Sequence, residues 1–469
     1  MKRSSGILLH VTSLPGGHGI GDMGQTAFKW IDFLAESRQQ YWQILPLTPP
    51  GYGYSPYSSN SSFAGNPLLI SLDLLADDGF LSKTELASES WNSAKVDYAR
   101  VEKFKTEQLK KAYVAFKASG PDKEYESFLE ENPWLAAYAN RIAQTNQQEP
   151  DFIRFQQYIF RKQWSKLKSY ARSNGVFIIG DLPMYVASDC VECDENPELF
   201  DRDSGCVAGA PPCNMYPAGQ SWGNPLYRWD KHREQQYKWW INRFRSTLQL
   251  VDVLRLDYFC GYHASWATDG KNGHWREGPR GGLFNVIKEK LGNVTFIAED
   301  LGQLTHEIHH LRDSYGIMST KVLQFAFDGT PDNPYLPENY TTRHCVVYTG
   351  THDNDTTRGW CRSAPDHVRQ NLRQRGISEH DVSWDLIKLA ARSTADLIIT
   401  PFQDVLCLDC EARFNTPGTV SSQNWSWRVS YNQIQTSTAD ALAWLVQHTD
   451  RIPAKPSLRM PVASIKDAS

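Results

Sequence analysis

The chain has 469 residues, enough to bury a large core and to carry insertions or a second domain. Its 49 Lys and Arg residues nearly balance 53 Asp and Glu residues, and a net charge of -4 gives no electrostatic basis for binding nucleic acid or an acidic membrane. No segment approaches the ~20 consecutive apolar residues of a membrane-spanning helix, so we expect neither nucleic acid nor a membrane as a partner.

The amino terminus and the cysteines indicate the compartment. The apolar stretch at residues 7–9 is too short for a signal peptide and leads directly into a strand pattern, so we expect a cytoplasmic protein. Nine scattered cysteines favour reduced thiols over a disulfide framework. Two pairs, Cys190 with Cys193 and Cys407 with Cys410, each have the spacing of half a zinc site. A zinc ribbon also needs a short gap between its pairs, so we expect no metal and no cofactor.

Short apolar runs that end in polar residues or glycine recur along the chain, separated by segments with helical periodicity. This pattern is typical of repeated strand and helix units. The predicted strands are residues 6–10, 41–47, 176–183, 252–257, 295–302, 321–327, 345–353 and 397–406. Eight such strands predict an α/β fold, a (β/α)8 TIM barrel.

Two of the intervening helices have a clear apolar face, which we interpret as core packing. The residues on these faces are Ala27, Trp30, Ile31 and Leu34 in the first helix, and Tyr237, Trp240, Ile241 and Phe244 in the helix before the fourth strand.

The chain exceeds the roughly 250 residues of a bare barrel, so we expect residues 1–469 to form one catalytic domain with insertions at its C-terminal face. Residues 48–150 begin with a loop rich in Gly, Pro, Ser and Tyr, which we expect to line the sugar groove, and continue as a helical subdomain near residues 83–150. Residues 184–229 are rich in Pro, Gly, Asn and Asp and predict a loop over the active site. Residues 455–469 predict a flexible tail.

Three predicted strands end in acidic residues. Asp257 ends the fourth strand, Glu299 lies near the end of the fifth, and Asp353 ends the seventh. In a barrel of this kind the chemistry takes place at the carboxyl ends of the strands, where these side chains should meet. They are therefore the candidate catalytic residues.

The neighbours of two of these acids indicate different roles. Arg255 is two residues from Asp257 on the same face of a strand, so its guanidinium can keep that carboxylate ionised, as a nucleophile requires. Glu299 follows the apolar Ile297 and Ala298, a setting that raises a carboxyl pKa and suits a proton donor. A retaining glycosidase needs two such carboxyl groups about 5 Å apart, which adjacent strands can supply.

A purely structural role is the alternative for these acids. Arg255 and Asp257 would form an ion pair in the barrel mouth, while Glu299 and Asp353 would accept hydrogen bonds from the backbone. Three acids at strand ends, one beside an Arg and one beside His352, favour the active site.

Long motifs in a fixed order extend over nearly the whole chain. They include GILLH at 6–10, YWQILPL at 41–47, SPY at 55–57, GDLPMYV at 180–186, WGNPLY at 222–227, AEDLG at 298–302, THDNDT at 351–356 and NTPGT at 415–419. In these motifs the chain strongly resembles the amylomaltases, the 4-α-glucanotransferases also called disproportionating enzymes, within the α-amylase clan. The resemblance implies α-1,4-glucans and maltooligosaccharides as donors and acceptors.

The resemblance also implies a mechanism. Asp257 would attack the anomeric carbon while Glu299 protonates the leaving oxygen, and a covalent glucosyl-enzyme would form. Glu299 would then act as a base for the 4-hydroxyl of an acceptor glucan. Asp353 and His352 would bind hydroxyl groups of the reacting sugar and favour its distorted form.

Further site residues follow from the same resemblance. Tyr57 would stack on the reacting sugar, Arg255 would orient the nucleophile, and Trp222 and Asp328 would line neighbouring subsites. For Tyr57 and Trp222, packing within a loop is the alternative. For Asp181, an ion pair beneath the site is the alternative to a sugar contact.

The chain departs from the family pattern at two places. The family usually has His-Phe-Arg-Gly after the nucleophile, whereas Tyr258-Phe259-Cys260-Gly261 stands here and lacks two potential charges. The family loop Pro-Pro-Asp-x-Phe-Ser-x-Thr-Gly-Gln becomes PPCNMYPAGQ at 211–220. Because the three carboxylates are intact, we expect bond cleavage to be retained, with an altered balance of transfer and hydrolysis or an altered acceptor length.

Two other functions compete with glucan transfer. One is a mainly hydrolytic α-glucan enzyme, in which water outcompetes the acceptor. The other is a glycan-binding protein without activity, which the intact set of Arg255, Asp257, Glu299 and Asp353 disfavours because binding alone does not require it.

Overall fold

A computed structural model describes residues 3–86, 90–92, 94–120, 122–212, 219–302 and 304–452. The predicted tail at 455–469 and residues 213–218 of the altered loop lie outside the described residues.

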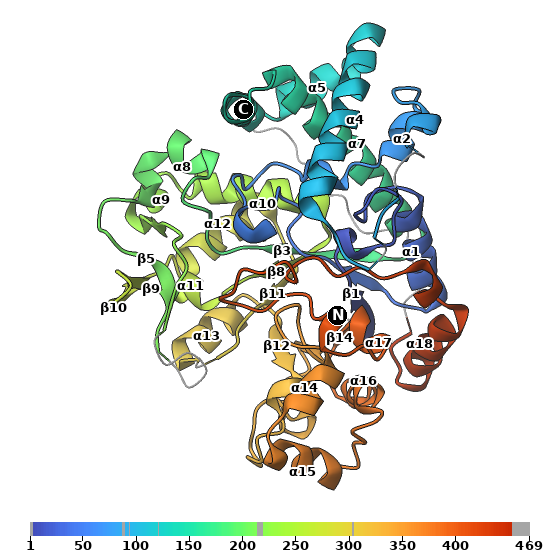
Figure 1. Cartoon of the computed structure of the whole chain (residues 1–469). Coiled ribbons are helices and arrows are strands. Elements are labelled where there is room, and N and C mark those ends of the chain that lie inside the picture. The colour runs from blue at the N-terminus through green and yellow to red at the C-terminus, as the bar shows by residue number, and fades with distance from the viewer. Residues whose placement is uncertain are drawn as a thin grey trace.

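Eight parallel strands form one sheet that curls into a barrel at the centre of the molecule (Figure 1). They are β1 (Ser4–Leu8), β2 (Tyr41–Gln43), β3 (Phe177–Leu182), β8 (Val253–Leu256), β11 (Phe296–Ala298), β12 (Ser319–Val322), β13 (Cys345–Tyr348) and β14 (Leu397–Pro401). Their order in the sheet is β11-β8-β3-β2-β1-β14-β13-β12. Met318 closes the barrel, because it accepts a hydrogen bond from Ala298 N–H (2.8 Å) and donates one to the Phe296 carbonyl (3.1 Å). The predicted (β/α)8 barrel is confirmed.

Five strands, β2, β11, β12, β13 and β14, end four or five residues earlier than the apolar pattern predicts, and two of them continue directly as helical turns. β12 stops at Val322 and continues as a 3-10 turn (Leu323–Phe325), and β14 stops at Pro401, where helix α17 (Phe402–Val405) begins. Leu323 and Phe402 are fully buried, as strand residues would be. The predictions of strands to 327 and 406 were wrong because a short buried apolar run does not distinguish a strand from a helical turn.

Helices surround the barrel. They are α1 (Gln25–Glu36), α7 (Pro150–Ser173), α10 (Lys238–Leu250), α12 (Gly281–Leu291), α13 (His306–Ser314), α14 (Thr357–Ser363), α15 (Asp366–Gln374), α16 (Val382–Arg392) and α18 (Thr436–His448). The two predicted apolar faces are buried against the core. Tyr237 belongs to the second face but precedes α10 as its N-cap residue.

Two long segments extend beyond the barrel strands and the helices that surround them. Between β2 and β3 lie α2 (Leu72–Asp77), α3 (Lys83–Leu86), α4 (Tyr98–Ser119), α5 (Lys123–Glu131) and α6 (Trp134–Asn146). Helices α4 and α5 project at the top of Figure 1. Between β3 and β8 lie α8 (Val191–Glu195), β4 (Phe200–Asp201), β5 (Val207–Ala210), β6 (Gln220–Ser221), β7 (Leu226–Tyr227) and α9 (Trp229–Glu234).

A second sheet joins the segment between β3 and β8 to residues that follow β8. Its antiparallel order is β10-β9-β5-β6, with β9 (Ala264–Thr268) and β10 (Gly273–Glu277) connected to β8 through α11 (Cys260–His263). β4 and β7 pair separately. The inserted segment is therefore tied to the chain just beyond Asp257. Among the described helices, none is both long and apolar enough to cross a membrane.

A substitution of Gly6 in β1 tests how tightly the barrel wall is packed. A Cβ atom there would lie 2.4 Å from the Tyr41 carbonyl oxygen and 2.8 Å from Ile399 Cδ1. We expect G6A to lower the free energy of unfolding by about 2 kcal/mol, since the clash involves backbone that cannot move freely. Urea denaturation followed by circular dichroism measures the change. G17A is the matched control because no atom outside Gly17 and its two chain neighbours lies within 4 Å of the added methyl group. Equal stabilities of the two variants would contradict the prediction.

Candidate active site

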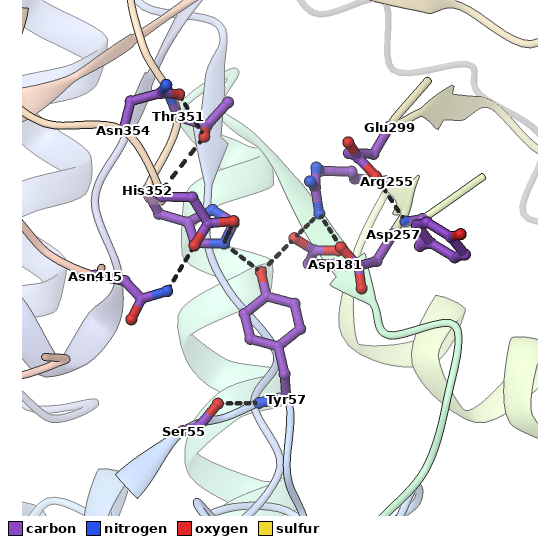
Figure 2. Close-up of polar contacts among 12 residues, drawn as sticks. Ser55, Tyr57, Asp181, Arg255, Asp257, Glu299, Thr351, His352, Asn354 and Asn415 are labelled. Atoms are coloured by element: carbon purple, nitrogen blue, oxygen red, sulfur yellow. Dashed lines mark hydrogen bonds and ion pairs between the residues drawn. The ribbon is translucent and has the colours of Figure 1, made fainter. Parts of the chain in front are cut away.

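Carboxyl groups gather at the carboxyl ends of the barrel strands (Figure 2). Asp181 lies near the end of β3, Asp257 directly follows β8, and Glu299 directly follows β11. Asp353 stands on the loop after β13. The strand ends thus bring together residues from positions far apart in the sequence, as the barrel predicts.

One arginine binds two of these carboxylates. Arg255 Nη1 lies 2.6 Å from Asp181 Oδ2 and 3.1 Å from Asp257 Oδ1. The side chains of Arg255 and Asp181 are buried, whereas that of Asp257 is 28% exposed. Burial raises the pKa of Asp181 to about 7, against the attraction of Arg255. The contact expected between Arg255 and Asp257 is present, but Arg255 lies closer to Asp181, which sequence spacing did not indicate.

Glu299 has a different environment. The main-chain N–H of Tyr258 donates to its Oε2 at 2.9 Å, and the preceding Ile297 and Ala298 are fully buried. Burial raises the pKa of Glu299 to about 8, and the nearby Arg255 only partly opposes this. At neutral pH this carboxyl group therefore carries a proton that it can donate.

Tyr57 connects Asp181 to His352. Its hydroxyl donates to Asp181 Oδ2 at 2.8 Å and lies 3.0 Å from His352 Nε2. The two rings stack with centroids 5.3 Å apart. Burial lowers the pKa of His352, so the imidazole is neutral near pH 7. The loop that follows β2 therefore supplies part of the site.

Asp353 is held from the far end of the chain. Its Oδ2 lies 3.4 Å from His352 Nε2, and its Oδ1 accepts a hydrogen bond from Asn415 Nδ2 at 2.6 Å. Arg413 Nη2 donates to the Asp353 carbonyl at 2.8 Å. The Asp353 side chain remains 42% exposed and open to a ligand. Sequence reasoning included Asn415 in the NTPGT motif but gave neither Asn415 nor Arg413 a role, because their partner is about sixty residues away.

The last two predicted residues lie outside this hydrogen-bonded cluster. Trp222 is half-buried and contacts it through Tyr258, with ring centroids 4.9 Å apart in a T-shaped arrangement. Asp328 is exposed and accepts a hydrogen bond from Thr330 N–H at 2.9 Å. No contact described for Asp328 reaches the carboxylates.

The two cysteine pairs do not form a common metal site. Cys190 and Cys193 are buried with their sulfur atoms 3.7 Å apart. Within the described ranges, the only group of three or more possible metal ligands is Asp409, Cys410 and Glu411, all at least partly exposed. This group contains one cysteine and lacks Cys407.

The fold and the cluster together define a class: (β/α)8 barrel proteins with the paired acids that glycosidic-bond chemistry uses. Comparison with known proteins specifies the family. The 4-alpha-glucanotransferase family matches residues 9–140 and 139–434. The chain therefore belongs to this family and is a 4-α-glucanotransferase-type enzyme that acts on α-glucans, as the resemblance implied. The alternative of a binding protein without activity is thereby set aside.

Individual relatives agree with this assignment. The 4-alpha-glucanotransferase of Thermus thermophilus is 39% identical over 96% of this chain and 100% of its own length. That of Synechocystis sp. is 38% identical over 96% and 99%. Among solved structures, the amylomaltase from Streptococcus agalactiae in complex with acarbose has a TM-score of 0.91 and 33% identity, covering 96% of this chain and 100% of that one.

Asn415 offers a test of how Asp353 is held. In N415D, a second carboxyl group would stand where the amide now donates at 2.6 Å, and like charges would force one of the pair to take a proton. We expect glucan-transferase activity to fall roughly a hundredfold, on the order of the loss of one strong charge-assisted contact. The assay is product formation from maltotriose. N432D is the control, because Asn432 is exposed and accepts its hydrogen bond through Oδ1, which Asp retains. Full activity of N415D would show that this contact does not matter.

Proposed function

We propose that the chain transfers α-1,4-glucan segments between maltooligosaccharides by a retaining double displacement, with Asp257 as nucleophile and Glu299 as acid and base. The main support is the contrast between the two acids, because Arg255 holds Asp257 while Glu299 carries a proton. A cytoplasmic location is part of this proposal.

In the first step, Asp257 attacks the anomeric carbon of the donor. The bond from that carbon to the glycosidic oxygen breaks, and the Glu299 proton moves to the leaving oxygen. This yields a glucosyl ester on Asp257, a shortened glucan and the Glu299 carboxylate. In the second step, Glu299 takes the proton of an acceptor 4-hydroxyl, whose oxygen attacks the same carbon and releases Asp257.

Arg255 serves both steps through Asp257. Its guanidinium holds the carboxylate in position before attack and stabilises the negative charge of the carboxylate when it leaves. Asp181 binds the same Nη1 atom as Asp257 and limits the movement of the guanidinium. We therefore assign Asp181 to positioning, the ion-pair alternative, rather than to direct sugar contact.

The sugar that reacts would lie against Tyr57, His352 and Asp353. Its hydroxyl groups can bind the exposed carboxylate of Asp353 and the edge of the neutral His352. Contacts that strengthen as the ring flattens towards an oxocarbenium-like geometry lower the barrier. Trp222 and Asp328 are proposed to contact glucose units beyond this sugar.

Hydrolysis is the second candidate, since water can take the place of the acceptor in the second step. The departures that motivate it are Tyr258 and Cys260, which are uncharged where the family usually has His and Arg. Tyr258 N–H binds Glu299, which takes part in both steps.

The products formed from maltotriose distinguish transfer from hydrolysis. We expect free glucose together with chains longer than three units, resolved by chromatography, because the second step passes the glycosyl group to another glucan. Glucose and maltose without longer chains would mean that hydrolysis dominates.

D257N should lose at least about a thousandfold in turnover, since no covalent intermediate can form. Undiminished turnover would exclude Asp257 as nucleophile.

The pH dependence of kcat/KM tests Glu299. The first step needs its protonated form, so activity should fall as pH rises through about 8, the value to which burial raises its pKa. In E299Q this alkaline decline should disappear, because the amide does not titrate. Turnover of maltotriose should drop by roughly three orders of magnitude, within the range of general acid catalysis.

A maltosyl fluoride donor provides the control for E299Q. Fluoride leaves without a proton, so the first step should be largely retained with this donor. Loss of fluoride release equal to the loss with maltotriose would argue against an acid role for Glu299.

A further inference from the structure

Tyr258 occupies an unusual backbone position directly after the proposed nucleophile. Its φ is +45°, in the left-handed region that residues other than glycine rarely adopt. Such a conformation persists only where the surrounding structure enforces it, and it is enriched at functional sites. The contacts of Tyr258 indicate what the conformation achieves.

The left-handed turn places the main chain against Glu299. Tyr258 N–H donates to Glu299 Oε2 at 2.9 Å, and Phe259 N–H donates to the Glu299 carbonyl at 3.0 Å. Glu299 N–H in turn donates to the Leu256 carbonyl at 3.0 Å. The loop that carries Asp257 thus also fixes the position of the second carboxyl group.

The same turn directs the Tyr258 side chain towards the inserted segment 184–229. Its ring meets Trp222 nearly perpendicularly, at 88° and 4.9 Å between centroids, and lies 6.2 Å from Tyr185. Its hydroxyl lies 3.5 Å from the Gly209 carbonyl on β5. Edge-to-face packing of this kind fixes ring orientation, so Tyr258 holds Trp222 in place.

These rings stand on the Glu299 side of the site. Figure 2 shows Glu299 and His352 on opposite sides of the pair formed by Arg255 and Asp181. If the reacting sugar lies against His352, the glycosidic oxygen lies towards Glu299, and the leaving or accepting glucan lies beyond it. Trp222 and Tyr258 therefore border the space that the acceptor enters.

We propose that Tyr258 determines the preference of the enzyme for a glucan acceptor over water, by holding Trp222 as a wall of the acceptor site. The proposal rests on the proposed transfer function. An aromatic wall offers the apolar face of an acceptor sugar a surface to stack on, and it excludes water from the covalent intermediate. Tyr258 acts as a positioning residue, because its contacts are with Trp222 and Glu299.

Y258A and Y258F test this proposal. Y258A removes the ring but keeps the N–H that binds Glu299, whereas Y258F keeps the ring. With maltosyl fluoride as donor, fluoride release reports the first step, and the dependence of transfer on added maltose gives the acceptor KM. In Y258A we expect the acceptor KM to rise roughly tenfold and more of the products to come from hydrolysis, with a much smaller fall in fluoride release. The alkaline decline assigned to Glu299 should keep its position.

Y258F should restore the preference for the acceptor, since its ring still packs on Trp222. W444A is a control for loss of an aromatic side chain, because Trp444 is 57% exposed on α18, outside the site. If Y258A does not fold, Y258L removes the ring while retaining apolar bulk, and the same measurements apply.

The outcomes separate the inference from the function on which it rests. Equal losses in fluoride release and acceptor use in Y258A, or an unchanged acceptor KM, would overturn the role of Tyr258 even if the unaltered enzyme forms longer glucans. If the unaltered enzyme forms no longer glucans, the transfer function fails and this inference fails with it.

Discussion

The ion pair between Arg255 and Asp181 organises the site, and the pairing of the barrel strands determines the position of this ion pair. The two residues stand directly opposite each other in the parallel pairing of β3 and β8, and Arg255 Nη1 also reaches Asp257. A shift of one residue in this register would turn Arg255 towards the outer face of the barrel. Breaking a buried pair by removing one partner typically costs about 3–5 kcal/mol, so the pair and the register stabilise each other.

The charge balance around this pair accounts for the different states of the acids. One guanidinium faces Asp181, Asp257 and Glu299, of which Asp181 is buried and the other two are partly exposed. It binds two of them directly, and the third lowers its own desolvation cost by keeping a proton. Glu299 therefore keeps a proton beside Asp257, which is partly exposed and is bound by Arg255.

Sequence predicted the parts of this arrangement that local patterns encode. Eight apolar runs specified the barrel, and Asp257, Glu299 and Asp353 stood out because strand ends place functional side chains. The strand predictions failed past Val322 and Pro401. There the chain stays buried but forms helical turns, which are as apolar as strands. The Asn415 contact to Asp353 and the left-handed turn at Tyr258 depend on tertiary structure, so no spacing rule could reveal them. The catalytic roles of individual residues remain predictions.

The substitutions after the nucleophile fit the same charge balance. Where the family usually has His and Arg, this chain has Tyr258 and Cys260, and burial raises the pKa of the Cys260 thiol to about 12, so neither side chain is charged at neutral pH. Arg312 on α13 is engaged with Asp300 at 2.6 Å. Arg255 is then the one cation described as acting on Glu299, and it is already bound to two carboxylates. A cation in place of Tyr258 or Cys260 would favour the ionised form of Glu299. Their neutrality therefore helps Glu299 to keep its proton, and the uncharged aromatic wall that results suits stacking on an acceptor sugar.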